Sequence, residues 1–459
     1  MNQVPIQNSQ VGNPVENLAG RPVEKTNVAD VARGAKLASR RLASVPGARR
    51  NAALSAAADA IEAHKSEILA ANRRDCDEAS RAVEAGSMSR ALFARLEIDE
   101  QSLTRMATGV REVAALPDPL GQTLAVTELD EGLTLYKESC PIGVIGIVFE
   151  ARPEIVPQIA ALALKSGNAV ILKGGSEAQH SNQALVQIWT DALSGFSDIP
   201  TEAINLLYTR ADVEELLSRE DEIDLIIPRG SREFVRHVAE RSRVPVLGHG
   251  EGICHVYIDG LADLEKAFNI ALDSKVQYPA ACNAVETLLV HEEIAAVFLP
   301  EMIARFQAAG VQVRGCPRTI EIVPAGNVVP ASEDDWETEY SDLIVSIKVV
   351  DSEESAIEHI NRYGSGHTEA IVTEDLSAAS RFMHRVDAAG VYHNASTRFA
   401  DGFRYGFGAE LGISTSKLHA RGPVGLEGLT TYKYKLIGDG QIVASYVAGE
   451  RAFKHRTIR

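Results

Sequence analysis

The spacing of apolar and polar residues divides the chain into a helical stretch and two longer stretches in which strands and helices alternate. From about Val28 to Leu116 apolar residues recur at helical intervals, and the pattern breaks at Pro46 and Gly47. We therefore expect a layer of helices there. The preceding residues 1–27 are polar and rich in Asn, Gln and Pro, which predicts a disordered tail.

Two runs rich in β-forming residues occupy residues 123–138 and flank Asp130, Glu131 and Gly132. Such runs around a turn predict a β-hairpin. A similar run, LTTYKYKLIGDG, returns within residues 428–459. Neither run has an obvious place in the two sheets predicted from the rest of the chain. We expect both to pair across a subunit boundary, in a small β-element of a homo-oligomer.

Short apolar runs alternate with helical segments over the remaining chain. GVIGIVFE, NAVILKG, INLLY, DLIIP and VPVLG are predicted strands before residue 254, and HVYID, AVETLLVH, VQVRG, DLIVSIKVV, EAIVTED and GVYHN are predicted strands after it. This alternation predicts parallel sheets covered by helices. We expect an α/β protein with one domain over residues 28–253 and a second over residues 254–427.

Composition and charge narrow the classes of partner. The chain carries 63 acidic and 46 basic side chains, a net charge of −17, which argues against nucleic acid or an anionic membrane as a partner. No apolar run reaches the ~18 residues of a membrane span. The five cysteines are widely spaced without a C-x-x-C pair, so we expect a cytoplasmic protein without a metal site.

Cys282 lies in QYPAACNAVETLLV, between a helix-breaking Pro279 and a predicted buried strand. A thiol where the chain changes direction is well placed to act as a nucleophile. An ordinary buried cysteine would fit the local sequence equally well.

A second candidate is ILKGGSEA, where a predicted strand ends at Lys173 and a helix begins near Ser176. Two glycines and a cation at a helix start favour a nucleotide phosphate, although a tight turn without a ligand has the same pattern. A standard Rossmann fingerprint and a P-loop are both absent from the sequence.

Together these segments resemble one known family. The run CPIGVIGIVFEARPEIVPQIAALALKSGNAVILKGGSEA is similar to the cofactor-binding part of the aldehyde dehydrogenase superfamily, and Cys282 falls where that superfamily keeps its nucleophile. The resemblance extends from about Ala29 to Arg451. It is tightest, through AIEHINRYGSGHTEAI and ISTSKLHARGPVGL, to the members that reduce L-glutamyl 5-phosphate to L-glutamate 5-semialdehyde in proline biosynthesis.

The resemblance implies an aldehyde dehydrogenase-like fold and a covalent mechanism. Cys282 would attack the acyl phosphate, expel phosphate and leave a thioester that hydride from NADPH converts to the aldehyde. We expect surroundings that lower the pKa of this thiol. Arg152 aligns with the superfamily's oxyanion asparagine, and an arginine there could hold a phosphate. Alternatively, Arg152 is an ion-pair partner of Glu150 or Glu154.

The superfamily pattern also assigns residues to cofactor and substrate. Lys173 would face the adenosine ribose, Gly230 and Ser231 the pyrophosphate, and Glu339 the nicotinamide ribose. Ser176 stands where NAD-preferring relatives often have a glutamate, so NADPH is the expected donor. Basic, hydroxyl and amide side chains are candidates for binding the α-carboxylate and α-ammonium of the substrate: Asn394, Ser396, Thr397, Lys417, His419 and Arg421. Functional coupling to glutamate 5-kinase is implied as well.

Three other functions fit parts of the sequence. A hydrolytic NAD(P)-dependent aldehyde dehydrogenase would need a glutamate base at or near the position of Gly248, and Glu251 could replace it only if the loop length differed. A cysteine hydrolase or acyltransferase would pair Cys282 with His249 or His255. A non-catalytic assembly protein would have kept only the fold.

Overall fold

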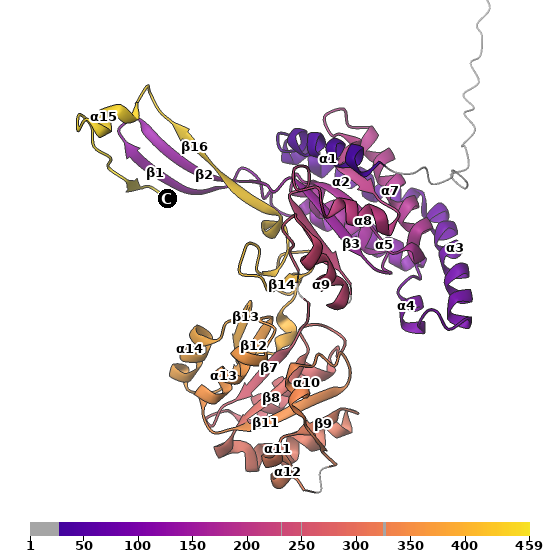
Figure 1. Ribbon diagram of the computed structural model, residues 1–459, viewed down its shortest axis with the longest axis vertical. Coiled ribbons are helices and arrows are strands. Elements are labelled where there is room, and N and C mark those ends of the chain that lie inside the picture. The colour runs from indigo at the N-terminus through magenta and orange to yellow at the C-terminus, as the bar shows by residue number, and fades with distance from the viewer. Residues whose placement is uncertain (1–26, 231, 249, 325–326) are drawn as a thin grey trace, which may run out of the picture.

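The computed structural model describes residues 27–230, 232–248, 250–324 and 327–459. Two α/β lobes and an arm of antiparallel strands make up the chain, and the arm projects away from both lobes (Figure 1). The predicted disordered tail lies, except for its last residue, outside the described residues.

Five helices open the first lobe, as the apolar spacing predicts. Asn27 caps the first of them, because its side-chain oxygen accepts hydrogen bonds from two amides in the first turn. Pro46 is extended and precedes the second helix, which confirms the break at this position. The helices are α1 (Val28–Leu42), α2 (Gly47–Ala63), α3 (Lys65–Glu84), α4 (Arg90–Ala94) and α5 (Glu100–Ala115).

The sheet of the first lobe is parallel, with the strand order β5-β4-β3-β6. Its strands are β3 (Val144–Phe149), β4 (Ala169–Lys173), β5 (Ile204–Leu206) and β6 (Leu225–Arg229). The helices between and after them are α6 (Ile155–Lys165), α7 (Gln179–Ser194), α8 (Arg210–Leu216) and α9 (Arg232–Arg241), with short 3₁₀ turns η1 (Ser176–Ala178) and η2 (Thr201–Ala203). The predicted strand VPVLG is wrong, because it makes only one isolated bridge, between Ile226 and Val246.

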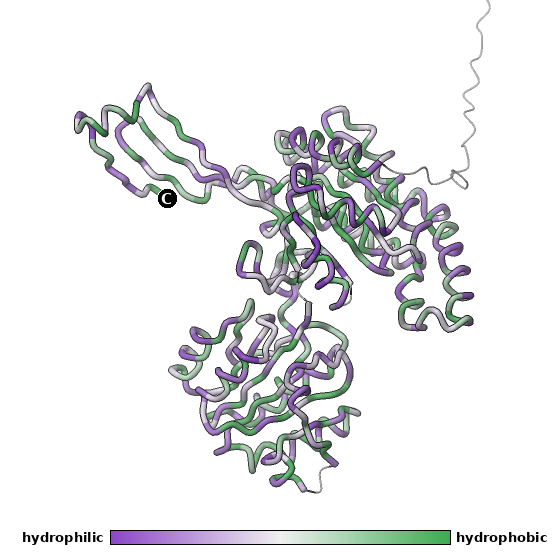
Figure 2. The backbone as a smooth tube through the Cα atoms, viewed as in Figure 1, coloured by the Kyte–Doolittle hydropathy of each residue, from purple (hydrophilic) through white to green (hydrophobic). Residues whose placement is uncertain are grey.

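Alternate residues of these strands face opposite layers of helices. Ile145 and Ile147 belong to a core shared with α2, α5, α6 and α7, whereas Val144 and Val148 belong to one shared with α1, α8 and α9. Burial on both faces explains why the strands are continuous apolar runs. Figure 2 shows that hydrophobic segments lie in the interior of this lobe and of the second lobe.

The second lobe is a seven-stranded parallel sheet in the order β10-β9-β11-β8-β7-β12-β13. Its strands are β7 (Cys254–Ile258), β8 (Val285–His291), β9 (Gln312–Gly315), β10 (Val329–Pro330), β11 (Ile344–Val350), β12 (Thr368–Val372) and β13 (Gly390–His393). Its helices are α10 (Leu264–Val276), α11 (Glu292–Ala308), α12 (Pro317–Ile322), α13 (Glu353–Tyr363) and α14 (Leu376–Arg385), with η3 (Glu333–Glu337) and η4 (Thr397–Phe399). Both predicted α/β sheets are therefore present.

After the second sheet the chain returns to the first lobe through residues 401–429. Leu411, Val424 and Leu429 are buried in the same core as Leu54 of α2. This return segment contains β14 (Ile413–Ser414), β15 (Gly422–Pro423) and η5 (Glu427–Leu429). The chain thus leaves the second sheet well before residue 427, because its apolar side chains complete the first core.

The arm is a four-stranded antiparallel sheet in the order β16-β2-β1-β17. It consists of β1 (Thr123–Asp130), β2 (Leu133–Pro141), β16 (Thr430–Ile437) and β17 (Arg456–Thr457), with α15 (Val443–Val447) beside them. The hairpin is confirmed. The prediction that hairpin and return strand pair across a subunit boundary is wrong for these two, because β16 pairs with β2 of the same chain over its whole length.

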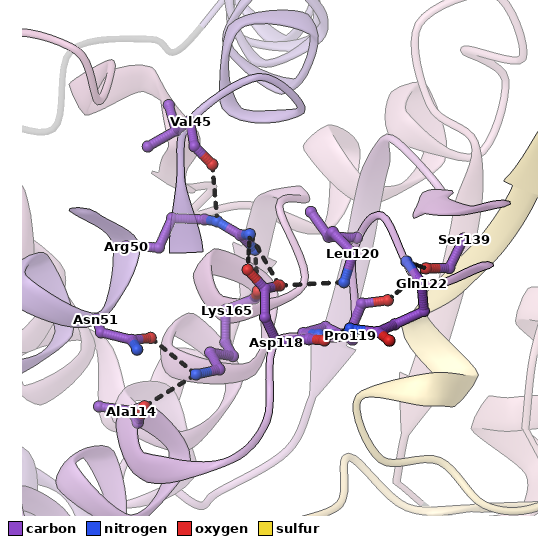
Figure 3. A network of polar contacts seen from close by, with 10 residues as sticks. All are labelled: Val45, Arg50, Asn51, Ala114, Asp118, Pro119, Leu120, Gln122, Ser139 and Lys165. Atoms are coloured by element: carbon purple, nitrogen blue, oxygen red, sulfur yellow. Dashed lines mark hydrogen bonds and ion pairs between the residues drawn. The ribbon is translucent and has the colours of Figure 1, made fainter. Parts of the chain in front are cut away.

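A polar network joins α2, α5 and α6 to the base of the arm (Figure 3). The Arg50 guanidinium, 2% exposed, donates from Nη2 to both oxygens of Asp118 at 2.9 Å and from Nε to the Val45 carbonyl at 3.2 Å. Arg50 also donates to the carbonyl of Lys165, whose ammonium donates to Asn51 Oδ1 at 2.7 Å. One cation thus fixes α2, the end of α6 and the linker into β1.

We expect Arg50→Met to lower the free energy of unfolding by about 2–3 kcal/mol, because it leaves buried carbonyls and Asp118 without their donor. Urea unfolding followed by circular dichroism measures the change. Arg49→Met is the matched control, since Arg49 pairs with Asp198 at the exposed surface, and its midpoint should stay near that of the wild type. Equal effects of the two substitutions would show that the network adds no stability.

Candidate active site

Cys282 lies in the turn between α10 and β8, at the amino end of β8. Two backbone hydrogen bonds close the turn. The Ala281 amide donates to the Tyr278 carbonyl at 3.2 Å, and the Ala284 amide donates to the Ala281 carbonyl at 2.9 Å. Gly252 passes so close that a β-carbon on it would overlap the Cys282 carbonyl. The thiol of Cys254 donates to that carbonyl at 3.3 Å. The Cys282 backbone is therefore tightly fixed.

Charged side chains from several segments act on the Cys282 thiol. Burial is the main reason that the pKa of Cys282 is raised to about 12, and the carboxylates of Glu339 and Glu410 raise it further. Arg229 and Arg398 act in the opposite direction. The expectation of a lowered pKa is therefore wrong for this state of the protein, because desolvation outweighs the two cations.

Arg152 follows the end of β3 and directly succeeds Ala151, which has a positive φ of 34°. Among the described residues its guanidinium has no hydrogen bond and no ion pair, so the alternative of an ion pair with Glu150 or Glu154 is not realised there. Burial is the main reason that the pKa of Arg229 is lowered, and the nearby Arg152 lowers it further. Arg152 is thus a half-buried cation available to an anionic ligand.

Arg229 and Glu410 are charged neighbours of the thiol that the sequence did not single out. Arg229 ends the buried strand β6, where a cation directly after four buried residues is unusual. Glu410 lies in the return segment, its Oε2 accepts from the Gly402 amide at 2.8 Å, and burial raises its pKa. Their sequence signal is weak, because only the folded chain brings residue 410 beside residue 229.

The carboxyl ends of β4 and β5 form a shallow pocket at the predicted nucleotide position. Its lining residues are Gly174, Gly175, Ser176, Gln179, Asn182, Leu206, Leu207 and Tyr208. Lys173 is 8% exposed, and burial lowers the pKa of its ammonium. That ammonium has neither an ion pair nor a hydrogen bond within the described part of the chain. A cation left without partners at a glycine-rich strand end fits the sugar and phosphates of a dinucleotide.

The remaining cofactor candidates lie at the end of β6 and in the second lobe. Gly230 is exposed at the end of β6, which β3 separates from β4, and Ser231 lies outside the described residues. Glu339 is half-buried in the second lobe and acts electrostatically on Cys282. Lys173, Ser176 and Gly230 thus share one sheet edge, and Glu339 approaches the thiol from the other lobe.

A fully buried ion pair supports the loop that carries Glu339. Lys275 Nζ in α10 lies 2.7 Å from Glu286 Oε2 in β8, and neither side chain is exposed. The Ser341 amide donates to Glu286 Oε1 at 3.3 Å. Burial raises the pKa of Glu286 and lowers that of Lys275. The pair holds the backbone two residues from Glu339, a role that only the carboxylate in the apolar run VETLLVH could have indicated.

The candidate substrate residues do not gather around the thiol through any contact found in the described chain. The amide of Asn394 is bonded to Thr373 and Glu374, and Ser396 receives a hydrogen bond from Ser274 at 3.1 Å. The Thr397 hydroxyl is buried.

The three basic candidates are also engaged elsewhere. Lys417 and Arg421 both pair with Asp387, and His419 contacts the Thr430 carbonyl at 2.8 Å. In the ligand-free chain, Lys417 and Arg421 are thus paired with the carboxylate of Asp387 in the second lobe.

A cysteine–histidine pair is not formed by the histidine that the structure describes. His255 is buried in β7 with Nδ1 3.0 Å from Glu369 Oε2, and it stacks edge-on against His359. The other candidate, His249, lies outside the described residues. Among the described residues there is also no cluster of three metal-ligating side chains, and no helix long and apolar enough to cross a membrane.

Comparison with known proteins identifies relatives over nearly the whole chain. The model of the aldehyde dehydrogenase family matches residues 7–320 and 328–434. A protein of Synechococcus sp. (strain JA-3-3Ab) named gamma-glutamyl phosphate reductase is 56% identical over 423 residues, which are 92% of each chain. A protein of the same name from Natronomonas pharaonis is 55% identical and covers 92% of this chain and 95% of its own.

Solved structures share the fold. The crystal structure of gamma-glutamyl phosphate reductase from Thermotoga maritima has a TM-score of 0.88 and 42% identity, over 91% of this chain and 100% of that one. A glyceraldehyde-3-phosphate dehydrogenase from Methanocaldococcus jannaschii, solved with NADP, has a TM-score of 0.62 at 18% identity, over 90% and 94% of the two chains. The predicted aldehyde dehydrogenase-like α/β fold is confirmed.

The raised thiol pKa predicts a pH dependence for alkylation of Cys282 in the protein without ligands. Because the thiol is protonated below its pKa, the rate of iodoacetamide labelling should rise about tenfold per pH unit between about pH 7 and about pH 9. Peptide mass spectrometry of residues 277–290 measures it, with Cys282→Ser as the control. A rate that levels off below about pH 8 would mean that the arginines outweigh burial.

Proposed function

This chain belongs to the aldehyde dehydrogenase family. We propose that it reduces L-glutamyl 5-phosphate to L-glutamate 5-semialdehyde with release of phosphate. One observation carries the proposal: in a chain 56% identical to a named gamma-glutamyl phosphate reductase, a fixed cysteine lies among arginines that have no carboxylate partner in the described structure. An acyl phosphate needs that combination of nucleophile and cations.

The chemistry of the first half-reaction follows from Cys282. Its sulfur bonds to the acyl carbon, the C–O bond to phosphate breaks, and the thiol proton leaves with the phosphate. A protonated thiol is therefore acceptable in the resting site, since the departing phosphate takes up the proton and leaves as HPO4²⁻. Arg152 aligns by sequence with the asparagine that superfamily members use for the acyl oxygen, and its guanidinium would stabilise the developing negative charge.

NADPH is the proposed donor, and when bound it supplies the hydride that reduces the thioester. Lys173, Ser176, Gly230 and Ser231 would bind its adenosine ribose and phosphates, and Glu339 its nicotinamide ribose. Ser176 leaves the pocket without an acidic side chain at that point. The adjacent Glu177 is held elsewhere, because its Oε1 accepts from the Ala151 amide at 2.7 Å.

Hydrolysis is the less favoured outcome for the thioester. Gly248 stands at or near the position of the glutamate that hydrolytic relatives use to activate water, and it lies against Pro228 of β6. A glycine cannot act as a base. Attack by phosphate, the reverse of the biosynthetic step, would then be the main route from the thioester back to acyl phosphate.

A homo-oligomer in the cytoplasm is the proposed working form. The arm carries large exposed apolar side chains on its edge strand β16, among them Tyr434, Leu436 and Ile437. Surfaces of this kind mark contacts between proteins. The five cysteines are free thiols, which suits a reducing compartment. An unstable acyl phosphate must be supplied by a kinase, so functional coupling to glutamate 5-kinase fits the proposal.

Phosphate dependence in the reverse direction tests the reaction. With glutamate semialdehyde and NADP⁺, we expect steady NADPH formation only when phosphate or arsenate is present, and none at all from Cys282→Ala. Steady turnover in phosphate-free buffer, with free glutamate as product, would favour the hydrolytic alternative. Acyl transfer without nicotinamide would favour a cysteine hydrolase, and the absence of any turnover in both the wild type and Cys282→Ala would favour the assembly protein.

Nucleotide preference tests the proposed cofactor pocket. We expect kcat/KM to favour NADPH over NADH, and Ser176→Glu to move that ratio toward NADH by about tenfold or more through repulsion of the 2′-phosphate. Ser194→Glu is the matched control, because it adds the same charge at the far end of α7. A wild-type preference for NADH, or the same shift in both variants, would contradict the assignment.

A further inference from the structure

Arg229 is a cation between the two lobes without a partner of opposite charge. It ends β6, its side chain is half-buried, and the described residues offer its guanidinium no hydrogen bond and no ion pair. Glu410, Arg152 and Cys282 act on it only at longer range. A guanidinium removed from water is costly unless an anion compensates it.

The absence of a side chain at Gly412 leaves room for this guanidinium. Gly412 in the return segment has a φ of 149°, and a β-carbon there would overlap Arg229 Nη1 and lie 3.1 Å from its Cζ. The backbone at Gly412 is held in place, since its carbonyl accepts from the Val424 amide at 2.7 Å. A side chain at position 412 would thus displace the guanidinium from the return segment.

The two neighbouring arginines, Arg398 and Arg152, are less available to a phosphate group than Arg229. Arg398 donates from Nε to Gln277 Oε1 at 2.9 Å, and it is 7% exposed. Arg152 is free, but it occupies the position proposed for the acyl oxygen. Of these three arginines, Arg229 is therefore the one available to bind the phosphate group of an acyl phosphate.

We propose that Arg229 binds the phosphate of the substrate and the phosphate that departs from it, a role that rests on the proposed function. Its planar fork can donate two parallel hydrogen bonds to phosphate oxygens. In the reverse direction it holds phosphate while an oxygen bonds to the thioester carbon, the C–S bond breaks, and the sulfur takes the phosphate proton.

The reverse reaction separates this role from an effect on the thiol alone. Without phosphate, semialdehyde and NADP⁺ should give one burst of NADPH per active site, which reports thioester formation. Added phosphate then drives turnover and yields a KM for phosphate. If Arg229 binds phosphate, its loss changes the KM for phosphate. If Arg229 acts only on the reactivity of Cys282, its loss changes the burst of NADPH.

For Arg229→Met we expect the burst amplitude and the KM for NADP⁺ to be retained, and the KM for phosphate to rise about 10- to 100-fold. Arg229→Lys should fall between, because it keeps the charge and loses the fork. Arg236→Met, an exposed residue of α9, is the control and should match the wild type. If Arg229→Met does not fold, Gly412→Ala, which displaces the guanidinium, should raise the KM for phosphate in the same way.

An unchanged KM for phosphate in Arg229→Met would overturn the proposal, whether or not the burst is reduced. Wild-type turnover without phosphate would instead overturn the proposed function itself. The two failures are distinguishable, because the first appears only in the variant and the second already in the wild type.

Discussion

The close passage of the chain at Gly252 past the backbone of Cys282 is the constraint on which the site depends. Gly252 allows no side chain there, and the next residue, Ile253, donates its amide to Ser365 Oγ at 2.9 Å before Cys254 enters β7. The segment that leaves the first lobe is thereby fixed to the turn that carries the thiol. As a result the amino end of β8 lies within electrostatic reach of Arg229, at the carboxyl end of β6.

Around this contact lie cations that an anionic substrate can compensate. Arg152 and Arg229 form no ion pair in the described chain, and the raised pKa of the half-buried Cys282 favours the protonated thiol at neutral pH. A phosphate-bearing acyl group supplies both the missing negative charge and an acceptor for the thiol proton. The same logic explains why the protein, with a net charge of −17, keeps a local group of arginines where its substrate is expected.

The sequence predicted those parts of the fold whose periodicity is set by burial. The strands of both parallel sheets appear as apolar runs because helices cover both faces, and Cys282 and Lys173 follow from the family resemblance. VPVLG failed because a run of apolar residues does not establish a ladder of hydrogen bonds. Arg229, Glu410 and the Lys275–Glu286 pair were missed, because their roles arise from contacts between distant segments. The pairing of Lys417 and Arg421 with Asp387 was not foreseen either, because it joins segments 30 or more residues apart.

The most direct measurement is the mass of the acylated enzyme. The protein is mixed with glutamate semialdehyde and NADP⁺ in phosphate-free buffer, quenched in acid, and digested for peptide mass spectrometry. The account predicts a glutamyl thioester on the peptide that contains Cys282, which disappears when phosphate is added before the quench and is absent from Cys282→Ser. An acyl group on another cysteine such as Cys254, or none on any peptide while NADPH is formed, would contradict it.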